Sequence, residues 1–230
     1  MAILTFDIEI TNEFDLLPGE DLEDYGPFDI SVAATHIPGG EELLWMSRTP
    51  TGTPAASMAT ADARALLHYL RAKQDEGHDL VAWNGLSFDL RWIGHVANDM
   101  ATARQVARRL YDPMYQFFKL KGYPVGLAKV AEGMGVPARK LMNGADAPKH
   151  WRAGNHQLVC DYVVGDVRLT ASVTQAILQA KRIQWITMRG SRSSVPLPHL
   201  LPVEHCMRLP MPDQSWMDDP IEDDKFLHWL

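Results

Sequence analysis

The stretch FDIEI, residues 6–10, places two carboxylates, Asp7 and Glu9, in a segment that otherwise has the composition of a buried β-strand. Side chains alternate between the two faces of a strand, so Asp7 and Glu9 lie on the same side. An unpaired carboxylate is costly to bury. The two acids therefore either face water at a strand end or surround a strongly positive partner.

The bulk composition predicts a protein with one substantial core, since 46% of the 230 residues are hydrophobic. No apolar run approaches the roughly 18–20 residues of a membrane span, so we expect no membrane partner. The start lacks a basic segment, and Asp7 interrupts its apolar stretch, which argues against a signal peptide. Cys160 and Cys206 show no metal-site spacing, which favours reduced thiols and a cytoplasmic location.

The net charge of −7 is unevenly distributed along the chain. Residues 13–29 hold seven acids and no Lys or Arg, residues 213–230 carry a net charge of −5, and residues 1–12 contribute −2. Residues 30–212 therefore carry a net charge of +7. A basic body of this kind is compatible with a polyanionic substrate.

Hydrophobic periodicity predicts an α/β fold. Residues 2–10, 30–37 and 42–47 have the pattern of a three-stranded antiparallel meander. Thr60 is expected to cap a helix that ends at Gly77, and residues 79–83 form a short buried strand. Further helices are expected from Leu86 onward and over residues 101–109, 127–135 and about 157–182. Strands with helices between and after them predict a mixed central sheet flanked by helices.

The last forty residues differ in composition from the rest. Six of the fifteen prolines occur from Ser191 on, which argues against a helix or a central strand. Aromatic residues there, such as Trp216, make the segment too apolar for a free linker. We expect one domain over residues 1–190 and an extended tail, residues 191–230, that packs on this domain and ends in a short helix.

Two further places concentrate acids where the pattern predicts burial or a site edge. In AWNGLSFDLRWI, Asp89 follows a strand that turns at Asn84 into a helix. In CDYVVGDVRLTASV, Tyr162 and Asp166 are four residues apart and share one helix face. Each place alone has an ordinary explanation: a solvated strand end, an acid at a helix start, or a surface hydrogen bond. Together, four carboxylates and one tyrosine suit two divalent cations with open positions for phosphate oxygens.

The three motifs resemble those of the DEDD family of 3′–5′ exonucleases, which have a ribonuclease H-like fold, and specifically its tyrosine-bearing DEDDy branch. That branch includes the proofreading domains of family A and B DNA polymerases, and the similarity is greater to the family B type. It spans about residues 1–186. The matching residues are Asp7 and Glu9 for D-x-E, Asn84, Phe88 and Asp89 for N-x-x-x-(F/Y)-D, and Tyr162 and Asp166 for Y-x-x-x-D. Since no polymerase domain follows, we expect a free-standing exonuclease.

A second register fits the histidine branch of the same family, H-x-x-x-x-D, with His156 and Asp161. Asp161 and Asp166 are about 140° apart around a helix, so they cannot both face the metals. If Asp166 is the ligand, His156 lies at or before the helix start. We prefer the tyrosine register because the sequence around Asp166 is more similar to the family.

The resemblance implies a site for two Mg²⁺ or Mn²⁺ ions. Asp7 would bridge them, Glu9 and Asp166 would complete the first position, and Asp89 would hold the second, largely through water. One ion would activate a water molecule and the other would stabilise the leaving 3′ oxygen.

Three more residues receive roles from the resemblance. Tyr162 would orient the attacking water, since a phenol with a pKa near 10 stays protonated at neutral pH. Asn84 and Phe88 would contact the terminal nucleotide, and Phe88 suits a core position equally well. The implied reaction releases 5′-mononucleotides one at a time from the 3′ end of single-stranded DNA.

Two alternatives remain for the function. One is an exoribonuclease on the same fold; the other is a non-catalytic nucleic-acid-binding protein. The intact set of acids argues against the second, because unneeded buried carboxylates destabilise a core.

Charged segments outside the motifs suggest further contacts with nucleic acid. The acidic segment 13–29 follows the first motif, so it is expected near the site mouth, where it would limit the entry of duplex DNA or would simply be solvated. Basic residues after the second motif would track the phosphates of a single strand or lie on solvated faces. These are Arg104, Arg108, Arg109, Lys119, Lys121, Arg139 and Lys140.

Overall fold

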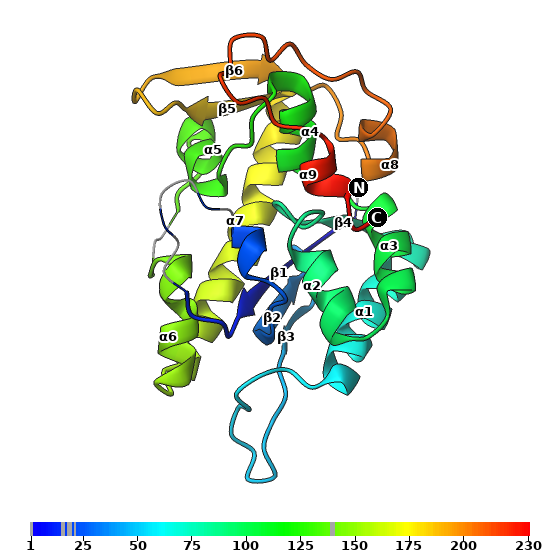
Figure 1. Ribbon diagram of the computed structural model, residues 1–230, viewed down its shortest axis with the longest axis vertical. Helices are drawn as coiled ribbons and strands as arrows, with labels where there is room; N and C mark the ends of the chain where they lie inside the picture. The colour runs from blue at the N-terminus through cyan, green and yellow to red at the C-terminus, as the bar shows by residue number, and fades with distance from the viewer. Residues whose placement is uncertain (1, 15–16, 18–19, 21, 139–140) are drawn as a thin grey trace.

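The computed structural model describes residues 2–14, 17, 20, 22–138 and 141–230 (Figure 1). The strands are β1 (Ile3–Ile10), β2 (Ile30–His36), β3 (Glu42–Trp45), β4 (Asp79–Val81), β5 (Arg182–Ile186) and β6 (Arg192–Pro196). The helices are α1 (Thr60–Asp75), α2 (Asp89–Val96), α3 (Met100–Arg108), α4 (Pro113–Lys121), α5 (Leu127–Met134), α6 (Ala147–Arg152), α7 (His156–Ala180), α8 (Val203–Cys206) and α9 (Asp224–Leu227). Two short 3₁₀ helices are η1 (Leu22–Tyr25) and η2 (Gly144–Asp146).

The central sheet has the strand order β3-β2-β1-β4. β1 pairs antiparallel with β2 and parallel with β4, and β2 pairs antiparallel with β3. The mixed sheet and its antiparallel meander confirm the predicted fold class. α7 covers one face of this sheet, and α1 and α2 lie on the other side (Figure 1).

Both faces of β1 are covered, which explains its nearly continuous burial. Leu4, Phe6 and Ile8 belong to the large core that contains the leucines of α1. The alternate positions point toward α7, where Thr5 Oγ1 donates a hydrogen bond of 2.8 Å to the carbonyl of Val167. Because side chains alternate along a strand, Asp7 and Glu9 face α7 as well.

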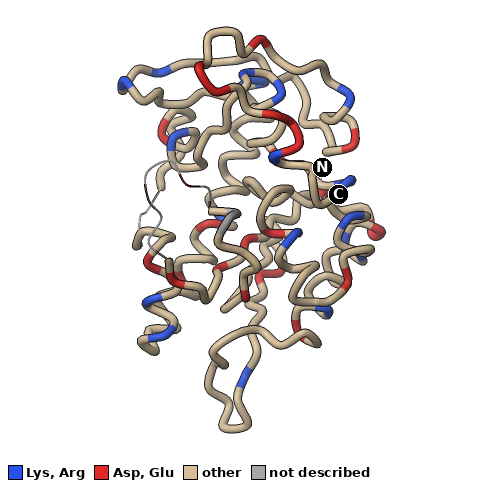
Figure 2. The backbone as a smooth tube through the Cα atoms, viewed as in Figure 1, with Lys and Arg blue, Asp and Glu red and all other residues tan. Residues whose placement is uncertain are grey.

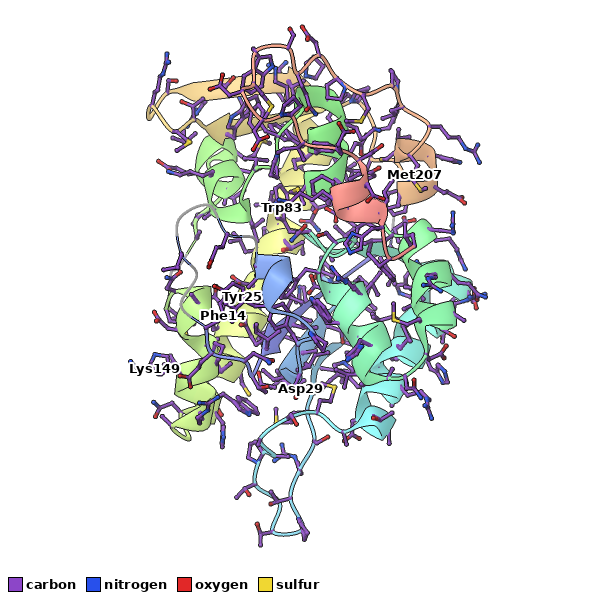
Figure 3. All side chains as sticks on the ribbon, viewed as in Figure 1. Phe14, Tyr25, Asp29, Trp83, Lys149 and Met207 are labelled. Carbon is purple, nitrogen blue, oxygen red and sulfur yellow. The ribbon has the colours of Figure 1, made fainter. Side chains whose placement is uncertain are left out.

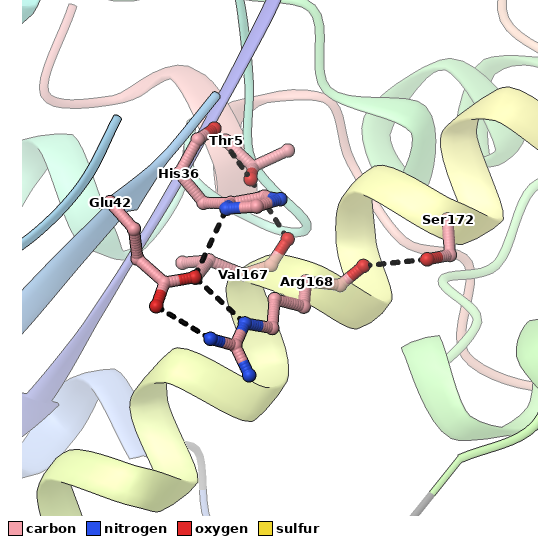
Figure 4. A network of polar contacts seen from close by, with 6 residues as sticks. All are labelled: Thr5, His36, Glu42, Val167, Arg168 and Ser172. Carbon is pink, nitrogen blue, oxygen red and sulfur yellow. Dashed lines mark hydrogen bonds and ion pairs between the residues drawn. The ribbon is translucent and has the colours of Figure 1, made fainter. Parts of the chain in front are cut away.

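A polar network fixes the position of α7 on the sheet (Figure 4). Besides the bond from Thr5 to Val167, the Arg168 guanidinium donates two hydrogen bonds of 2.7 Å to the Glu42 carboxylate on β3. His36 on β2 lies 3.1 Å from the same carboxylate. The two residues that follow Asp166 are therefore bonded to β1 and β3, which places Asp166 opposite β1.

The cap of α1 differs from the prediction. The residue before the helix is Ala59, and Thr60 is the first helical residue. Ser47, from the loop after β3, takes the capping role: its hydroxyl accepts a hydrogen bond of 2.7 Å from the Ala59 N–H and also bonds the Asp62 carboxylate. A local pattern could not reveal a cap that comes from twelve residues away.

Helix α4 lies in a stretch for which no helix was predicted. Asp112 caps its start, Pro113 is its first residue, and Gly122 ends it with a φ of +82°. These are ordinary helix boundary signals, so the sequence contained the information.

The C-terminal part is also more structured than an extended tail. β5 and β6 form an antiparallel hairpin, and α8 is helical although a helix was excluded for that stretch. The predicted boundary between residues 190 and 191 falls in the turn of this hairpin, and the division of the chain there stays a prediction. α9 lies where the short terminal helix was expected.

Within the described residues, no helix combines the length and the apolar character needed to cross a bilayer. Cys160 and Cys206 are both buried free thiols.

Candidate active site

Three carboxylates converge between β1 and α7. Asp7 and Glu9 on β1 and Asp166 on α7 each have an oxygen within 4.8 Å of the others. Glu9 is buried, and Asp7 and Asp166 are partly buried. Tyr162 lies four residues before Asp166 on α7, so its side chain shares the helix face of Asp166.

Asp89 joins this group from the other side of β1. It is the first residue of α2 and is only 3% exposed, and its Oδ1 accepts a hydrogen bond of 3.0 Å from the backbone N–H of Ile8. The pairing of β1 with β4 ends at Thr5 and Val81, so the edge of β1 beyond that point is free for the Asp89 side chain. We call Asp7, Glu9, Asp89 and Asp166 the acidic cluster.

The acidic cluster holds its protons more tightly than ordinary carboxyls. Burial raises the pKa of Asp7 and of Glu9 well above the usual range, and the neighbouring carboxylates raise both further. Burial raises the pKa of Asp89 to about 7, although the Ile8 N–H opposes the shift, and it raises the pKa of Asp166 to about 6. Like charges held together with little water are the arrangement that a cation would stabilise.

The turn before Asp89 is held by Asp112, a residue that was not predicted to belong to the site. Asn84 has a φ of +67°, and a Cβ on Gly85 would lie 2.4 Å from the Cβ of Ala82, so this turn needs both residue types. The Asp112 carboxylate accepts hydrogen bonds from the backbone N–H groups of Asn84 and Leu86, at 3.1 and 3.0 Å. Asp112 thus links the start of α4 to the turn that leads to Asp89.

A cavity of about 510 Å³ opens beside Glu9. Phe14, Leu22 and Phe88 line it, with Gly144 on another side. We call this space the site cavity. Phe14 and Leu22 belong to the segment 13–29, so its described part lies next to the site, as expected (Figure 3). Asp15 and Asp21 lie outside the described residues.

Tyr162 reaches the acidic cluster from α7. Burial of its hydroxyl, followed by the charges of the neighbouring Asp166 and Glu9, raises its pKa. A Cβ added to Gly144 would lie 3.2 Å from this hydroxyl, so the glycine leaves room for it. Tyr162 therefore stays a neutral hydroxyl beside the carboxylates.

The residues of the histidine register lie elsewhere. His156 is the first residue of α7 and packs against Trp151, with ring centroids 4.5 Å apart. Asp161 is exposed and accepts a hydrogen bond of 2.8 Å from the Gln157 amide. The structure brings Tyr162, not His156, to the acidic cluster.

A comparison with models of protein families identifies the superfamily of the chain. A family model of the RNase_H superfamily matches residues 48–174, more than half of the chain. The chain belongs to the RNase_H superfamily. The matched range contains Asp89, Tyr162 and Asp166 and begins after β1, which carries Asp7 and Glu9.

Solved structures support the same fold for this RNase_H superfamily member. One similar chain is that of the family B DNA polymerase from the hyperthermophilic archaeon Pyrobaculum calidifontis, with a TM-score of 0.55 and 20% identity. The match covers 76% of this chain and 24% of the polymerase chain, so this chain spans about a quarter of that protein. No curated protein matches. The predicted resemblance to the exonuclease-containing polymerases is confirmed at the level of the fold, and the DEDDy branch stays a prediction.

Membership of the RNase_H superfamily supports a nuclease, that is, a hydrolase acting on nucleic acid. The donor set fits divalent metal ions: carboxylate oxygens are the preferred ligands of Mg²⁺ and Mn²⁺, and they lie close enough to share a cation. The structure brings Asp7, Glu9, Asp89, Asp166 and Tyr162 together, Phe88 lines the site cavity, and Asn84 lies in the turn before Asp89. Their catalytic roles stay predictions.

The predicted phosphate track is contradicted at Lys119, and at the other residues it stays a prediction. Lys and Arg residues are spread over helices and loops around the molecule (Figure 2). The Lys119 side chain is 1% exposed and pairs with Asp223, so its prediction as a strand contact is wrong. Arg109 pairs with Asp75, and Arg104 donates to the Trp229 carbonyl. Arg139 and Lys140 lie outside the described residues.

Proposed function

We propose that the protein is a metal-dependent 3′–5′ exonuclease that removes 5′-mononucleotides from single-stranded DNA. The observation that carries this proposal is the acidic cluster, in which four carboxylates from β1, α2 and α7 meet with raised pKa values. Such a cluster destabilises a fold unless cations compensate its charge. Membership of the RNase_H superfamily supports nucleic acid as the substrate.

The residues of the cluster would divide the work by position. Asp7 lies close to both Asp89 and Asp166, so it would contact two cations, with Glu9 and Asp166 on one and Asp89 on the other. When bound, the cations supply an activated water and stabilise the leaving oxygen.

Tyr162 and the site cavity would position the reactants. The Tyr162 hydroxyl stays protonated, so it would hold the attacking water by a hydrogen bond and would not remove its proton. The site cavity lies beside Glu9 and would receive the terminal nucleotide, whose base would stack on an aromatic ring such as Phe14 or Phe88. Asn84, in the turn before Asp89, would contact the same terminal nucleotide.

Digestion of a 5′-labelled single-stranded oligonucleotide with Mn²⁺ tests the proposal. We expect a ladder of products shortened one nucleotide at a time, and no products in EDTA. Asp166→Asn should lower kcat/KM at least about a thousandfold, because a lost ligand removes several kcal/mol of transition-state stabilisation.

Asp161→Asn is the matched control, since Asp161 is an exposed acid on the same helix. It should keep the wild-type rate. Equal activity of the Asp166→Asn protein, or digestion that persists in EDTA, would contradict the proposal. An RNA oligonucleotide of the same sequence decides between DNA and RNA, and we expect the faster rate on DNA.

A further inference from the structure

Strand β3 is the outermost strand of the central sheet, and within the described residues no strand pairs with its outer edge. Its pairing with β2 begins at a turn in which the Ile37 N–H donates a hydrogen bond of 2.8 Å to the Glu41 carbonyl. Hydrogen-bonded and non-hydrogen-bonded pairs alternate along an antiparallel ladder. Glu42 and Leu44 therefore occupy non-hydrogen-bonded positions, and their backbone N–H and C=O groups point away from β2. These groups are available to an added strand.

A cavity of about 670 Å³ lies between this open edge and helix α7. We call it the edge groove. Its lining comes from β3, from the segment between α5 and η2 and from one face of α7, and it includes Glu42, Leu44, Leu141, Val164, Arg168 and Leu169. No described residue lines both the edge groove and the site cavity, so the two spaces are separate.

The edge groove exposes apolar side chains beside the free backbone groups. Arg168 on α7 bonds Glu42, so this face of β3 is turned toward α7, and Leu44, two residues further along the strand, faces the same way. The Leu44 side chain is 43% exposed, and Val164 on α7 is partly buried. An exposed leucine on an open strand edge favours pairing with another chain.

The described charges around the edge groove are mainly acidic. Glu42, Asp161 and Asp166 line it, and Asp161 is exposed. The one cation among its described lining residues is Arg168, whose guanidinium is already paired with Glu42 (Figure 4). Such a lining favours a basic ligand and disfavours both nucleic acid and a second copy of the same groove.

A space between an open strand edge and a helix is the arrangement in which an extended peptide adds a strand to a sheet. The peptide backbone supplies the N–H and C=O groups that pair with the edge, and alternate side chains reach the groove. We propose that the edge groove binds an extended peptide segment of a partner protein, with two apolar side chains against Leu44 and Val164 and a basic side chain near Asp161. This docking surface goes beyond the proposed function and does not depend on it.

A synthetic peptide, Lys-Thr-Val-Thr-Leu-Thr-Lys, acetylated, amidated and labelled with a fluorophore, tests the inference. Alternation places its Lys, Val and Leu side chains on one face and its threonines on the other. Fluorescence anisotropy with the full chain measures Kd. We expect this peptide to bind at least about tenfold tighter than the same peptide with Ser in place of Val and Leu, because the apolar side chains leave water. Replacing both Lys by Glu should also weaken binding.

Methylation of alternate backbone nitrogens separates strand addition from apolar contact alone. The N–H groups of successive residues in a strand point to opposite edges, so only one of the two alternate sets can face β3. Methylation of that set should abolish binding. Methylation of the other set should leave Kd within about threefold.

Leu44→Ser is the matching variant of the protein, and Met188→Ser is its control, since Met188 is an exposed apolar residue in the β5–β6 turn outside the edge groove. Leu44→Ser should weaken peptide binding at least about fivefold, whereas Met188→Ser should not change it. Neither residue belongs to the acidic cluster, so both variants should digest the oligonucleotide at the wild-type rate. The binding measurement needs no nuclease activity, so failure of the proposed function leaves it valid.

Three outcomes with the peptides would overturn the inference: equal binding of the Ser peptide, tighter binding of the Glu peptide, or the same effect from both methylated sets. An unchanged Kd for Leu44→Ser would overturn it as well. Light scattering tests for a second copy in the groove. A wild-type dimer that Leu44→Ser dissociates would show that another copy of this chain covers the edge, and it would contradict the proposed partner.

Discussion

The acidic cluster and Asp112 both bring carboxylates to the segment 84–89, yet the surroundings of these carboxylates differ. Asp89 is itself a member of the cluster, whereas Asp112 bonds the turn before it. Asp112 is 1% exposed and accepts hydrogen bonds from four backbone N–H groups, those of Asn84, Leu86, Met114 and Tyr115. The cluster carboxylates mainly face one another, and the Ile8 N–H donates a hydrogen bond to Asp89. Burial of a carboxylate therefore does not by itself indicate catalysis. A carboxylate surrounded by N–H donors stabilises the fold, whereas one surrounded by other carboxylates suits a cation-binding site.

The pH dependence of the free energy of unfolding without metal should be the largest effect, and it reports mainly on the acidic cluster, although burial also raises the pKa of Asp112, to about 6. The folded pKa of Asp89 is about 7 and that of Asp166 about 6, both above the roughly 3.9 of an unfolded aspartate. The folded protein therefore binds these protons more tightly, so its free energy of unfolding falls as pH rises from about 4 to 7, by a few kcal/mol in total. In EDTA we expect Tm to drop between pH 5 and pH 8, and Mn²⁺ to reverse the drop at the upper end.

Asp166→Asn provides the control for this experiment. With one carboxylate fewer in the cluster, its Tm in EDTA should fall less steeply over the same pH range. The prediction is wrong if the wild-type Tm in EDTA does not change between pH 5 and pH 8. It is also wrong if Mn²⁺ raises Tm equally at both pH values, because the charge of the cluster would then not destabilise the fold.

Tyr162 gives a second test of the acidic cluster, because it places a neutral hydroxyl beside the carboxylates. Tyr162→Phe removes the hydroxyl beside Asp166 and with it the proposed hold on the attacking water, so kcat should fall about 10- to 100-fold, the equivalent of about 1.5–3 kcal/mol. Steady-state digestion of the oligonucleotide measures this. His156→Ala should stay within about twofold of the wild type, and the reverse ranking would favour the histidine register instead.

Neutralising one acid in each group gives the smallest but most direct contrast. Asp7→Asn removes one like charge from the cluster and should stabilise the metal-free protein at pH 8. Asp112→Asn weakens an acceptor for four N–H groups and should destabilise it by about 1–3 kcal/mol. Urea unfolding in EDTA measures both changes, and shifts of the same sign would remove the distinction between the two groups.

Much of the fold was predictable because it depends on local periodicity. The alternation in β1, the meander and the long helix that carries Tyr162 and Asp166 all follow from residues near in sequence. α4 was not predicted, although Asp112, Pro113 and Gly122 mark its boundaries. The β5–β6 hairpin was missed because its proline content favoured an irregular tail, and a strand at the edge of a two-stranded sheet tolerates proline.

In the candidate site, too, local spacing was predictable and long-range contacts were not. Spacing along β1 and α7 was enough to group Asp7 with Glu9 and Tyr162 with Asp166, because two-residue and four-residue periods put side chains on one face. The contacts that hold them in place were not predictable. Thr5 meets Val167 across 162 residues, and Trp229 meets Leu86 across 143.

In this protein the residue types that bear the chemistry, and the faces of their elements on which they lie, can be read from the order of the residues. The burial of Lys119 against Asp223 and the hydrogen bonds from the turn before Asp89 to Asp112 follow from packing between distant segments. The physical reason is the range of the interactions. Backbone sterics and side-chain periodicity act over a few residues and are legible in the sequence, whereas packing joins segments whose separation along the chain carries no pattern.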